Sequence, residues 1–163
     1  MADNERAHLL ELLGKFKTGM LVTRAADGHL RARPMMIALT EQGGELWFAT
    51  DIHSPKIAEI EAAPEVNLAL MEGDAYLSLS GTAQVVRDPA KVAELWNEAW
   101  RVWFDGGPDD PDLVLLRFDP SDGEYWDNQG TNKLRFLVQA ARAYLKGEEL
   151  REGDESQHGE ARL

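Results

Sequence analysis

Three basic side chains in the first third of the sequence could bind a small anion. Arg31 and Arg33 lie two residues apart, so they would share one face of a β-strand, and Lys56 follows Ser54 and Pro55. Serine is favoured just before a helix and proline at its first position, so a helix should begin at residue 55. A helix start presents unpaired N–H groups and the positive end of the helix dipole. Together these groups predict a phosphate site; the alternative is a solvated basic face.

The strand that would carry the arginines covers residues 29–40, where polar and apolar side chains alternate. One of its faces would pass from guanidinium groups to apolar side chains, which suits an anion attached to a flat apolar ring. The alternative is a half-buried strand whose arginines reach into water. Pro34 has no N–H and therefore belongs at a bulge or an edge. A turn at residues 43–44 should lead into a partner strand at residues 45–50. The residues expected on this face are Arg31, Arg33, Met35, Ile37 and Leu39.

The charge of the chain restricts its partners. The 163 residues include 29 acidic and 17 basic side chains, which gives a net charge of −12. Nucleic acid and anionic membrane surfaces would repel such a protein, so neither is an expected partner. The basic residues gather in residues 14–40, whereas residues 105–127 are strongly acidic. A local basic cluster in an acidic protein favours the binding of one small anion.

Several classes of site are excluded by what the sequence lacks. Without cysteine there are no disulfides, thiolate nucleophiles or cysteine metal sites. The histidines are scattered, and Asp109, Asp110 and Asp112 lack the spacing of a calcium loop, so no metal is expected. Glycine-rich nucleotide motifs are also absent. The apolar runs are too short to span a membrane and the charged N-terminus does not resemble a secretory signal, which predicts a soluble cytoplasmic protein.

The remaining pattern predicts a small closed β-barrel with peripheral helices. An amphipathic helix is expected within residues 3–17, then a strand at 20–24 and a hairpin at Asp27-Gly28. Further strands are expected at 66–71, 75–87, 113–118 and 123–126, with a bend at Gly81. Residues 1–147 would form one domain ending in a helix at 133–146, and the acidic residues 148–163 would be disordered.

A third helix is expected to begin at Pro89 and to carry a face rich in tryptophan. Packing in the core or against a second subunit is the favoured interpretation, and stacking on a ring-shaped ligand is the alternative. The residues on this face are Val92, Leu95, Trp96, Ala99, Trp100 and Trp103.

Several short runs, taken in their order and spacing, resemble the flavin-binding split-barrel family typified by pyridoxamine 5′-phosphate oxidase. They are R-x-R-P-M (31–35), L-W-F-A-T (46–50), S-P-K (54–56), G-T-A-Q-V (81–85), E-L-W (94–96), W-F (103–104), D-D-P (109–111) and E-Y-W-D (124–127). The likeness is strongest to the bacterial general-stress FMN-binding branch. It implies a mainly β fold with peripheral helices, namely a six-stranded antiparallel split β-barrel. It also implies a homodimer that holds a flavin in each of two clefts between the subunits.

The resemblance also implies a cofactor, which is FMN with FAD as the alternative, and a set of residues that bind it. These are Arg33, Ser54 and Lys56 at the phosphate, Pro34, Met35 and Met36 along the ring, Ala49 and Thr50 through backbone and hydroxyl contacts, and Trp126 across the dimer interface.

Two departures from the oxidase pattern argue against a vitamin B6 substrate. Ala38 stands where the oxidases carry a lysine for the substrate phosphate, and residues 133–135 lack the histidine of their Arg-x-His pair. No side chain is a convincing general acid or base. The sequence therefore predicts a general-stress-type flavin protein acting as a flavin-dependent oxidoreductase, but not as a vitamin B6 oxidase. The alternatives are a non-catalytic flavin store, scavenger or sensor, and the same barrel carrying a deazaflavin or a heme.

Overall fold

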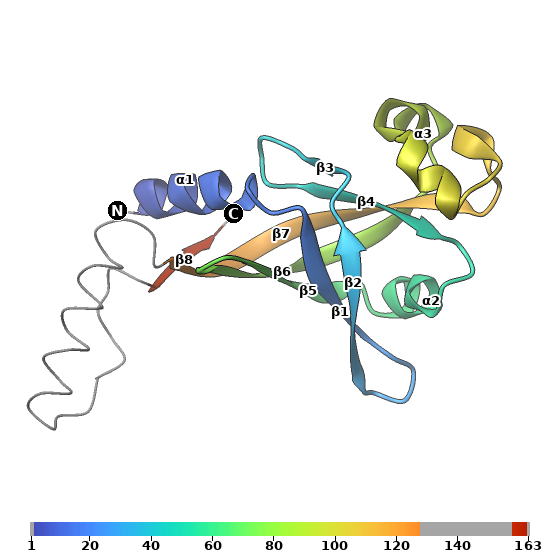
Figure 1. The fold of residues 1–163 in the computed structure, drawn as a ribbon. Helices are drawn as coiled ribbons and strands as arrows, with labels where there is room; N and C mark the ends of the chain where they lie inside the picture. The colour runs from blue at the N-terminus through green and yellow to red at the C-terminus, as the bar shows by residue number, and fades with distance from the viewer. Residues whose placement is uncertain (1, 128–157, 163) are drawn as a thin grey trace, which may run out of the picture.

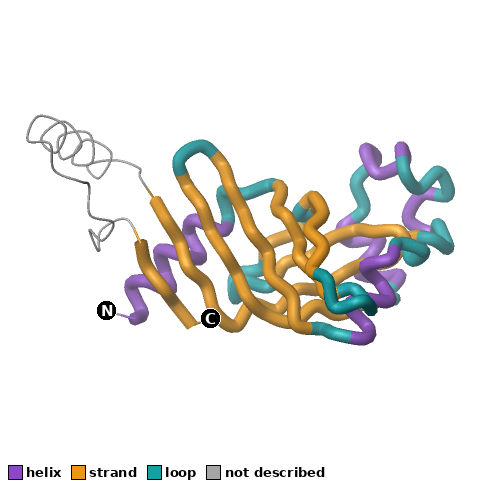
Figure 2. The backbone as a smooth tube through the Cα atoms, turned by 90° about the horizontal axis from the view of Figure 1, so that it is seen from below, coloured by secondary structure: helices purple, strands orange, loops and turns teal. Residues whose placement is uncertain are grey.

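The computed structural model describes residues 2–127 and 158–162, and one curled antiparallel sheet organises them (Figure 1). The strand order is β2-β1-β5-β6-β7-β4-β3, with β8 paired to β7. Helix α1 lies at one end of the sheet, and α2 and α3 lie toward the other end (Figure 2). In this part of the chain no helix is long and apolar enough to cross a membrane. The elements are α1 (Ala2–Leu13), β1 (Thr18–Arg24), β2 (Leu30–Met36), β3 (Leu39–Thr40), β4 (Leu46–Asp51), α2 (Pro55–Ala62), β5 (Glu65–Glu72), β6 (Ala75–Val86), α3 (Pro89–Leu95), the 3₁₀ helices η1 (Glu98–Val102) and η2 (Gly107–Asp109), β7 (Leu113–Asp127) and β8 (His158–Arg162).

The predicted mainly β fold with peripheral helices is confirmed. Strands β1, β2, β4, β5, β6 and β7 form the body of the sheet, and the two-residue β3 and the five-residue β8 are additions. Strands β2 and β3 are the outer members of the strand order. The short link between them joins the two ends of the strand order. There the Ile37 N–H donates to the Lys17 carbonyl and the Ala38 N–H donates to the Trp47 carbonyl.

The prediction of one strand at residues 29–40 is wrong. The segment divides into β2, which pairs with β1, and β3, which pairs with β4. Because β1 and β4 are not neighbours in the sheet, the chain must leave the first partner before it reaches the second. The hairpin at residues 27–28 is confirmed, with Gly28 at a φ of +84°. Pro34 lies on the edge strand β2, as its missing N–H requires.

The two strands predicted at 113–118 and 123–126 are one continuous strand, β7. The bend predicted at Gly81 is confirmed, because the β6–β7 register shifts between Ser80 and Gly81. A Cβ atom on Gly81 would lie 2.2 Å from the Asp119 carbonyl oxygen, so the two long strands can approach there only with glycine. The irregularity lets β7 continue past Pro120 instead of turning.

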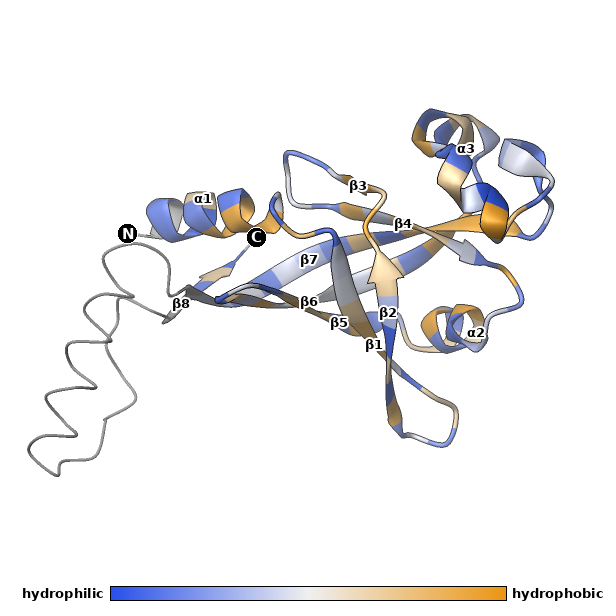
Figure 3. Ribbon diagram, viewed as in Figure 1, coloured by the Kyte–Doolittle hydropathy of each residue, from blue (hydrophilic) through white to orange (hydrophobic). Residues whose placement is uncertain are grey.

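Two apolar clusters lie on opposite faces of β4 and β7. The main core fills the curl, and Leu46 and Phe48 of β4 contribute to it together with Ile57 and Ile60 of α2. The second cluster packs under α3 and η1, against the strongly apolar first half of β7 (Figure 3). Its buried members are Trp47, Val92, Trp100, Phe104, Leu113 and Leu115.

The predicted tryptophan helix is wrong beyond residue 95. Helix α3 ends at Leu95, Trp96 is extended with a ψ of 133°, and the Asn97 side chain accepts a hydrogen bond from the Ala99 N–H at 2.9 Å. This local hydrogen bond starts a separate 3₁₀ helix, because asparagine side chains compete with continuation of an α-helix. The tryptophans therefore differ in environment: Trp100 is 8% exposed and Trp103 is 66% exposed.

Part of the segment predicted to be disordered forms a strand. Residues 158–162 are β8 and pair with residues 122–126 of β7. Strand β4 pairs with residues 113–118, which leaves the second half of β7 with an open edge. Backbone pairing at an open edge requires no apolar sequence, so composition carries no signal for it. The predicted helix at 133–146 and the rest of the acidic segment lie outside the described residues.

Candidate functional site

Arg33 lies at the centre of a polar network between the sheet and α2. Its Nη1 atom donates to Thr23 Oγ1 at 2.6 Å and to Glu59 Oε2 at 2.8 Å. The Thr23 hydroxyl donates to the same Glu59 oxygen at 2.6 Å. Thr23 is 1% exposed and Glu59 is 8% exposed. Three elements, β1, β2 and α2, are thus connected by buried polar contacts.

The strand register explains why these side chains meet. Arg33 is paired with Leu21 of β1, and Thr23 follows two residues later on the same inward face. Helix α2 packs against β1 and β6. Lys56 and Glu59 are three residues apart on this helix, so they lie on one side of it. The inward faces of two strands and one face of a helix therefore converge.

Lys56 places a buried ammonium group beside this network. The residue is 8% exposed, and its Nζ donates to Ser54 Oγ at 2.6 Å. Within residues 2–127 and 158–162 the Lys56 ammonium forms no ion pair. Burial lowers the pKa of Lys56, and the nearby positive charge of Arg33 lowers it further, while Asp51 and Glu59 act in the opposite direction. A bound anion would offset this cost.

One edge of the Arg33 guanidinium is open. Both of its hydrogen bonds start from Nη1, and its Nε and Nη2 atoms meet no acceptor among the described residues. The side chain is 21% exposed, so solvent or a ligand can reach it. Two N–H groups along one guanidinium edge match the geometry of a phosphate or carboxylate. The arrangement is suited to one anion held between Arg33 and Lys56.

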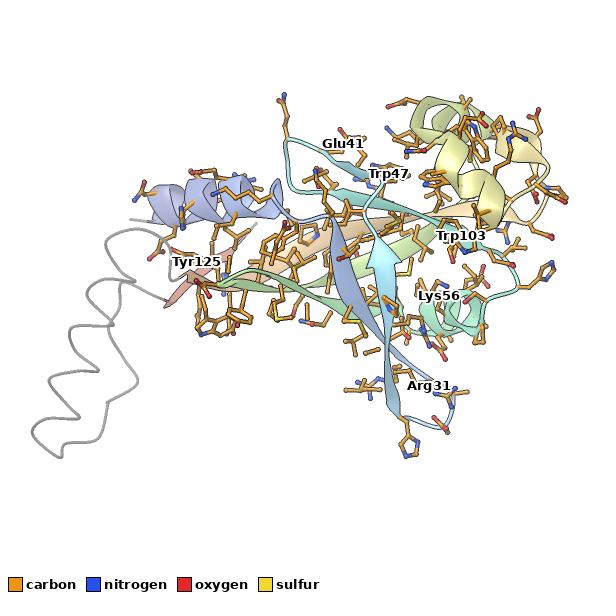
Figure 4. All side chains as sticks on the ribbon, in the orientation of Figure 1. Arg31, Glu41, Trp47, Lys56, Trp103 and Tyr125 are labelled. Carbon is orange, nitrogen blue, oxygen red and sulfur yellow. The ribbon has the colours of Figure 1, made fainter. Side chains whose placement is uncertain are left out.

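Ser54 and Pro55 occupy the predicted N-cap and first helical positions of α2. The Ser54 hydroxyl does not cap the helix; it accepts the hydrogen bond from Lys56. The hydroxyl proton of Ser54 can therefore be donated elsewhere, and the first N–H groups of α2 have no side-chain cap. These donors add to the two cations at the same end of the sheet, where Figure 4 shows Lys56 on α2.

The other predicted residues do not all join this cluster. Met35 is 7% exposed and packs in the main core, whereas Met36 is 58% exposed and Pro34 is exposed on the outer face of β2. On β4, Thr50 is 6% exposed, and Ala49 packs against the second cluster. The Met35 side chain is thus part of the core. Only the Met35 backbone, on the edge strand β2, is left to contact a ligand.

Trp126 lies at the opposite end of the sheet. Its neighbour Tyr125 marks this end in Figure 4, far from Lys56. Trp126 is paired with Tyr76 of β6, which is paired with Met71 of β5. The three residues are between 38% and 67% exposed. Within one chain Trp126 does not reach the basic cluster.

Thr23 and Glu59 are the residues that sequence reasoning missed. Both are polar residues at inward positions: Thr23 continues the buried alternation of β1, and Glu59 is one helical turn after Lys56. A polar side chain at a position whose period predicts burial needs a partner. That signal could have pointed to Arg33.

Comparisons with known proteins agree with this fold. Residues 4–151 match the family described as pyridoxamine 5′-phosphate oxidase like. The chain is 31% identical over 119 residues to general stress protein 26 of Bacillus subtilis. The matched region covers 70% of this chain and 82% of that protein. It is 34% identical over 128 residues to the protein bli-3 of Neurospora crassa, which covers 71% of this chain. The match spans 61% of the Neurospora protein, less than two thirds of its length.

A solved structure extends the likeness to three dimensions. The general stress FMN/FAD-binding protein of Xanthomonas citri superposes with a TM-score of 0.67 at 32% identity, over 78% of this chain and 92% of that one. The family match includes β1, β2 and α2, which carry the polar network, and it extends through β7. The chain therefore belongs to the pyridoxamine 5′-phosphate oxidase-like family.

Proposed function

We propose that the protein binds FMN, with the phosphate held between Arg33 and Lys56, and that it acts as a flavin-dependent oxidoreductase. The observation that carries this proposal is the buried Lys56 ammonium, which forms no ion pair among the described residues, beside a guanidinium with one open edge. Buried charges are normally paired, so an unpaired one next to unused donors favours an anionic ligand.

The donors present fit a phosphate monoester. Arg33 offers two N–H groups along its open edge, Lys56 offers the ammonium protons not used on Ser54, and Ser54 offers its hydroxyl proton. A phosphate has enough acceptor oxygens for all of them. The phosphate is common to FMN and FAD, so this part of the site suits either; FMN is proposed because its phosphate is terminal.

The ring of the flavin is proposed to lie between two copies of the chain. Five apolar side chains are exposed on the same outer face of β1, β2, β5, β6 and β7: Met20, Met36, Met71, Tyr76 and Trp126. A contiguous apolar surface of this kind favours a protein interface. In a homodimer built on this face, the partner subunit's Trp126 could approach the flavin, although Trp126 cannot do so within one chain.

The flavin would supply the hydride and electron transfer, and the chain would bind it, orient it and exclude water. The substrate is not expected to be a vitamin B6 phosphate. Ala38 is partly buried against the second cluster and offers no charge for a substrate phosphate. The same observation favours the second candidate function, a flavin-binding store, scavenger or sensor without turnover.

The absorption spectrum of the purified protein, followed by a titration with FMN, tests the proposal. Oxidised flavin has a visible spectrum that differs from those of a deazaflavin and a heme. A protein that is colourless and remains unable to bind added FMN would overturn the proposal. Reduction of the bound flavin by NADH or NADPH, followed by reoxidation over many cycles, would separate the oxidoreductase from the non-catalytic candidate. Sedimentation of the wild type and of Tyr76→Glu would test the dimer, because a buried carboxylate at this face should separate the subunits.

A further inference from the structure

Glu59 is a buried carboxylate that the proposed flavin site does not use directly. It lies on the far side of Arg33 from the open guanidinium edge and receives both the Arg33 and the Thr23 hydrogen bonds on one oxygen, Oε2. We propose that Glu59 is the counter-ion of the phosphate site: it stabilises the two cations before a ligand binds and limits how tightly the phosphate is held. This inference rests on the proposed function of Arg33 and Lys56.

Different nitrogen atoms of the Arg33 guanidinium face the carboxylate and the open edge. Glu59 and Thr23 occupy Nη1, and Nε and Nη2 meet no acceptor in residues 2–127 and 158–162. Glu59 is therefore able to stay in place when an anion binds to the open edge. Arg33 would then lie between two negative groups, one belonging to the chain and one to the ligand.

The charges indicate why the two cations need this carboxylate before a ligand binds. Arg33 lowers the pKa of Lys56, which is a repulsion between two cations, and Glu59 acts against it. The pKa of Glu59 is itself held below its usual value, first by the Thr23 hydrogen bond and then by Arg33. Glu59 is thus ionised at neutral pH. Without Glu59, the Arg33 guanidinium would lose its ion pair, and its repulsion of the buried Lys56 ammonium would be opposed less.

The same negative charge must repel the ligand. A phosphate on the open edge would lie within one guanidinium width of Glu59, where like charges still interact strongly in a partly buried site. Replacing Glu59 by glutamine keeps an oxygen that can accept from Arg33 and Thr23 and removes the charge. Glu59→Gln should therefore bind FMN more tightly, while the empty protein becomes less stable.

Riboflavin provides the comparison that isolates this effect, because it has the flavin ring without the phosphate. In Glu59→Gln the dissociation constant for FMN should fall by roughly tenfold, the scale of a like-charge repulsion in a partly solvated site, and that for riboflavin should not change. The melting temperature of the flavin-free variant should fall below that of the wild type. Glu61→Gln is the matched control, at an exposed position on the same helix. It should change neither the two dissociation constants nor the melting temperature.

If the wild type binds FMN and riboflavin equally, the phosphate site itself is wrong and the inference falls with it. If the wild type prefers FMN but Glu59→Gln shifts both ligands together, Glu59 has a structural role and this inference is overturned while the proposed function stands. A selective loss of FMN would also overturn it, because Glu59 would then orient Arg33 rather than oppose the phosphate. If the flavin-free variant does not fold, exchange of bound FMN against riboflavin measures the same ratio.

Discussion

Lys56 and Lys91 are both lysines next to a packed cluster, but the chain neutralises them differently. The Lys91 Nζ lies 3.2 Å from a Glu41 carboxylate oxygen, 3.0 Å from one of Glu94, and 5.0 Å from the centre of the Trp47 ring. The Lys56 Nζ donates to the Ser54 hydroxyl and forms no ion pair among the described residues. The hydrogen bond to Glu94 is the main cause of a raised pKa for Lys91, whereas burial lowers the pKa of Lys56.

This difference distinguishes a structural cation from a binding cation. Lys91 lies on α3 and is paired with acidic residues of its own chain, near Glu41 and Trp47 in Figure 4, so it has little capacity left for a ligand. Lys56 is buried without full compensation, which lowers the stability of the empty protein. A group retained at such a cost is expected at a functional site. Variants of Arg33, Lys56 and Lys91 would show whether the two lysines divide in this way.

Arg33→Ala should have the largest effect. It removes a charged hydrogen-bond donor to the phosphate, which should weaken FMN binding by about 1.5–3 kcal/mol. It also leaves Glu59 as a buried carboxylate without its cation, so the melting temperature should fall as well. Flavin fluorescence titration and thermal unfolding measure the two effects. Arg24→Ala is the control and should bind FMN as the wild type does, because Arg24 lies next to Thr23 on β1 but is exposed on the opposite face. If Arg33→Ala also bound FMN as tightly as the wild type, Arg33 would not be part of the site.

Lys56→Met should weaken FMN binding by a similar amount, about 1.5–3 kcal/mol, without lowering stability. The variant keeps the apolar stem and removes a buried charge, so the flavin-free protein should melt at the same or a higher temperature. This pairing of lost binding with preserved stability is the mark of a binding cation. A fall in melting temperature with unchanged FMN affinity would place Lys56 in the structural class.

Lys91→Met should show the reverse pattern. It removes two ion pairs and the contact with the Trp47 ring, so the melting temperature should fall. Binding of FMN should match the wild type, because the second cluster lies on the other face of β4 from the main core. The same two assays apply, and a selective loss of FMN binding in this variant would contradict the distinction between the two lysines.

Alkaline pH should reveal Lys56 by a smaller effect. Its pKa is lowered in the folded protein, so the unfolded chain binds more protons between that value and the usual value of about 10.4. Lys56 therefore makes the free energy of unfolding of the empty protein rise with pH in this window. Binding of FMN should weaken in the same window, since a neutral amine does not attract phosphate. Subtracting the profile of Lys56→Met removes the other titrating groups; identical profiles would show that Lys56 does not titrate there.

The sequence predicted the fold and the proximity of Arg33, Ser54 and Lys56 because the signals for both are local. The glycine turns, the Ser54-Pro55 helix start and the strand that carries Arg33 each depend on a few adjacent residues, and the structure brings Arg33, Ser54 and Lys56 to one end of the sheet. Whether these residues bind FMN remains a prediction.

The parts that could not be predicted depend on distant partners. The break between β2 and β3 follows from the order of the strands in the sheet, and β8 follows from an open edge of β7. The end of α3 depends on whether Asn97 continues the helix or accepts a hydrogen bond from the Ala99 N–H, and the structure has the hydrogen bond. Glu59 is 26 residues from Arg33 in the sequence and becomes its partner only when α2 packs on the sheet, so no local pattern indicates the pair.

Calorimetric titration of the wild-type protein with FMN and with riboflavin tests the central claim most directly. If Arg33 and Lys56 hold the phosphate, FMN should bind more tightly than riboflavin by roughly two to four orders of magnitude, which is the scale of two charge-assisted hydrogen bonds. Equal affinities for the two flavins would show that the phosphate contributes nothing, and would contradict the account.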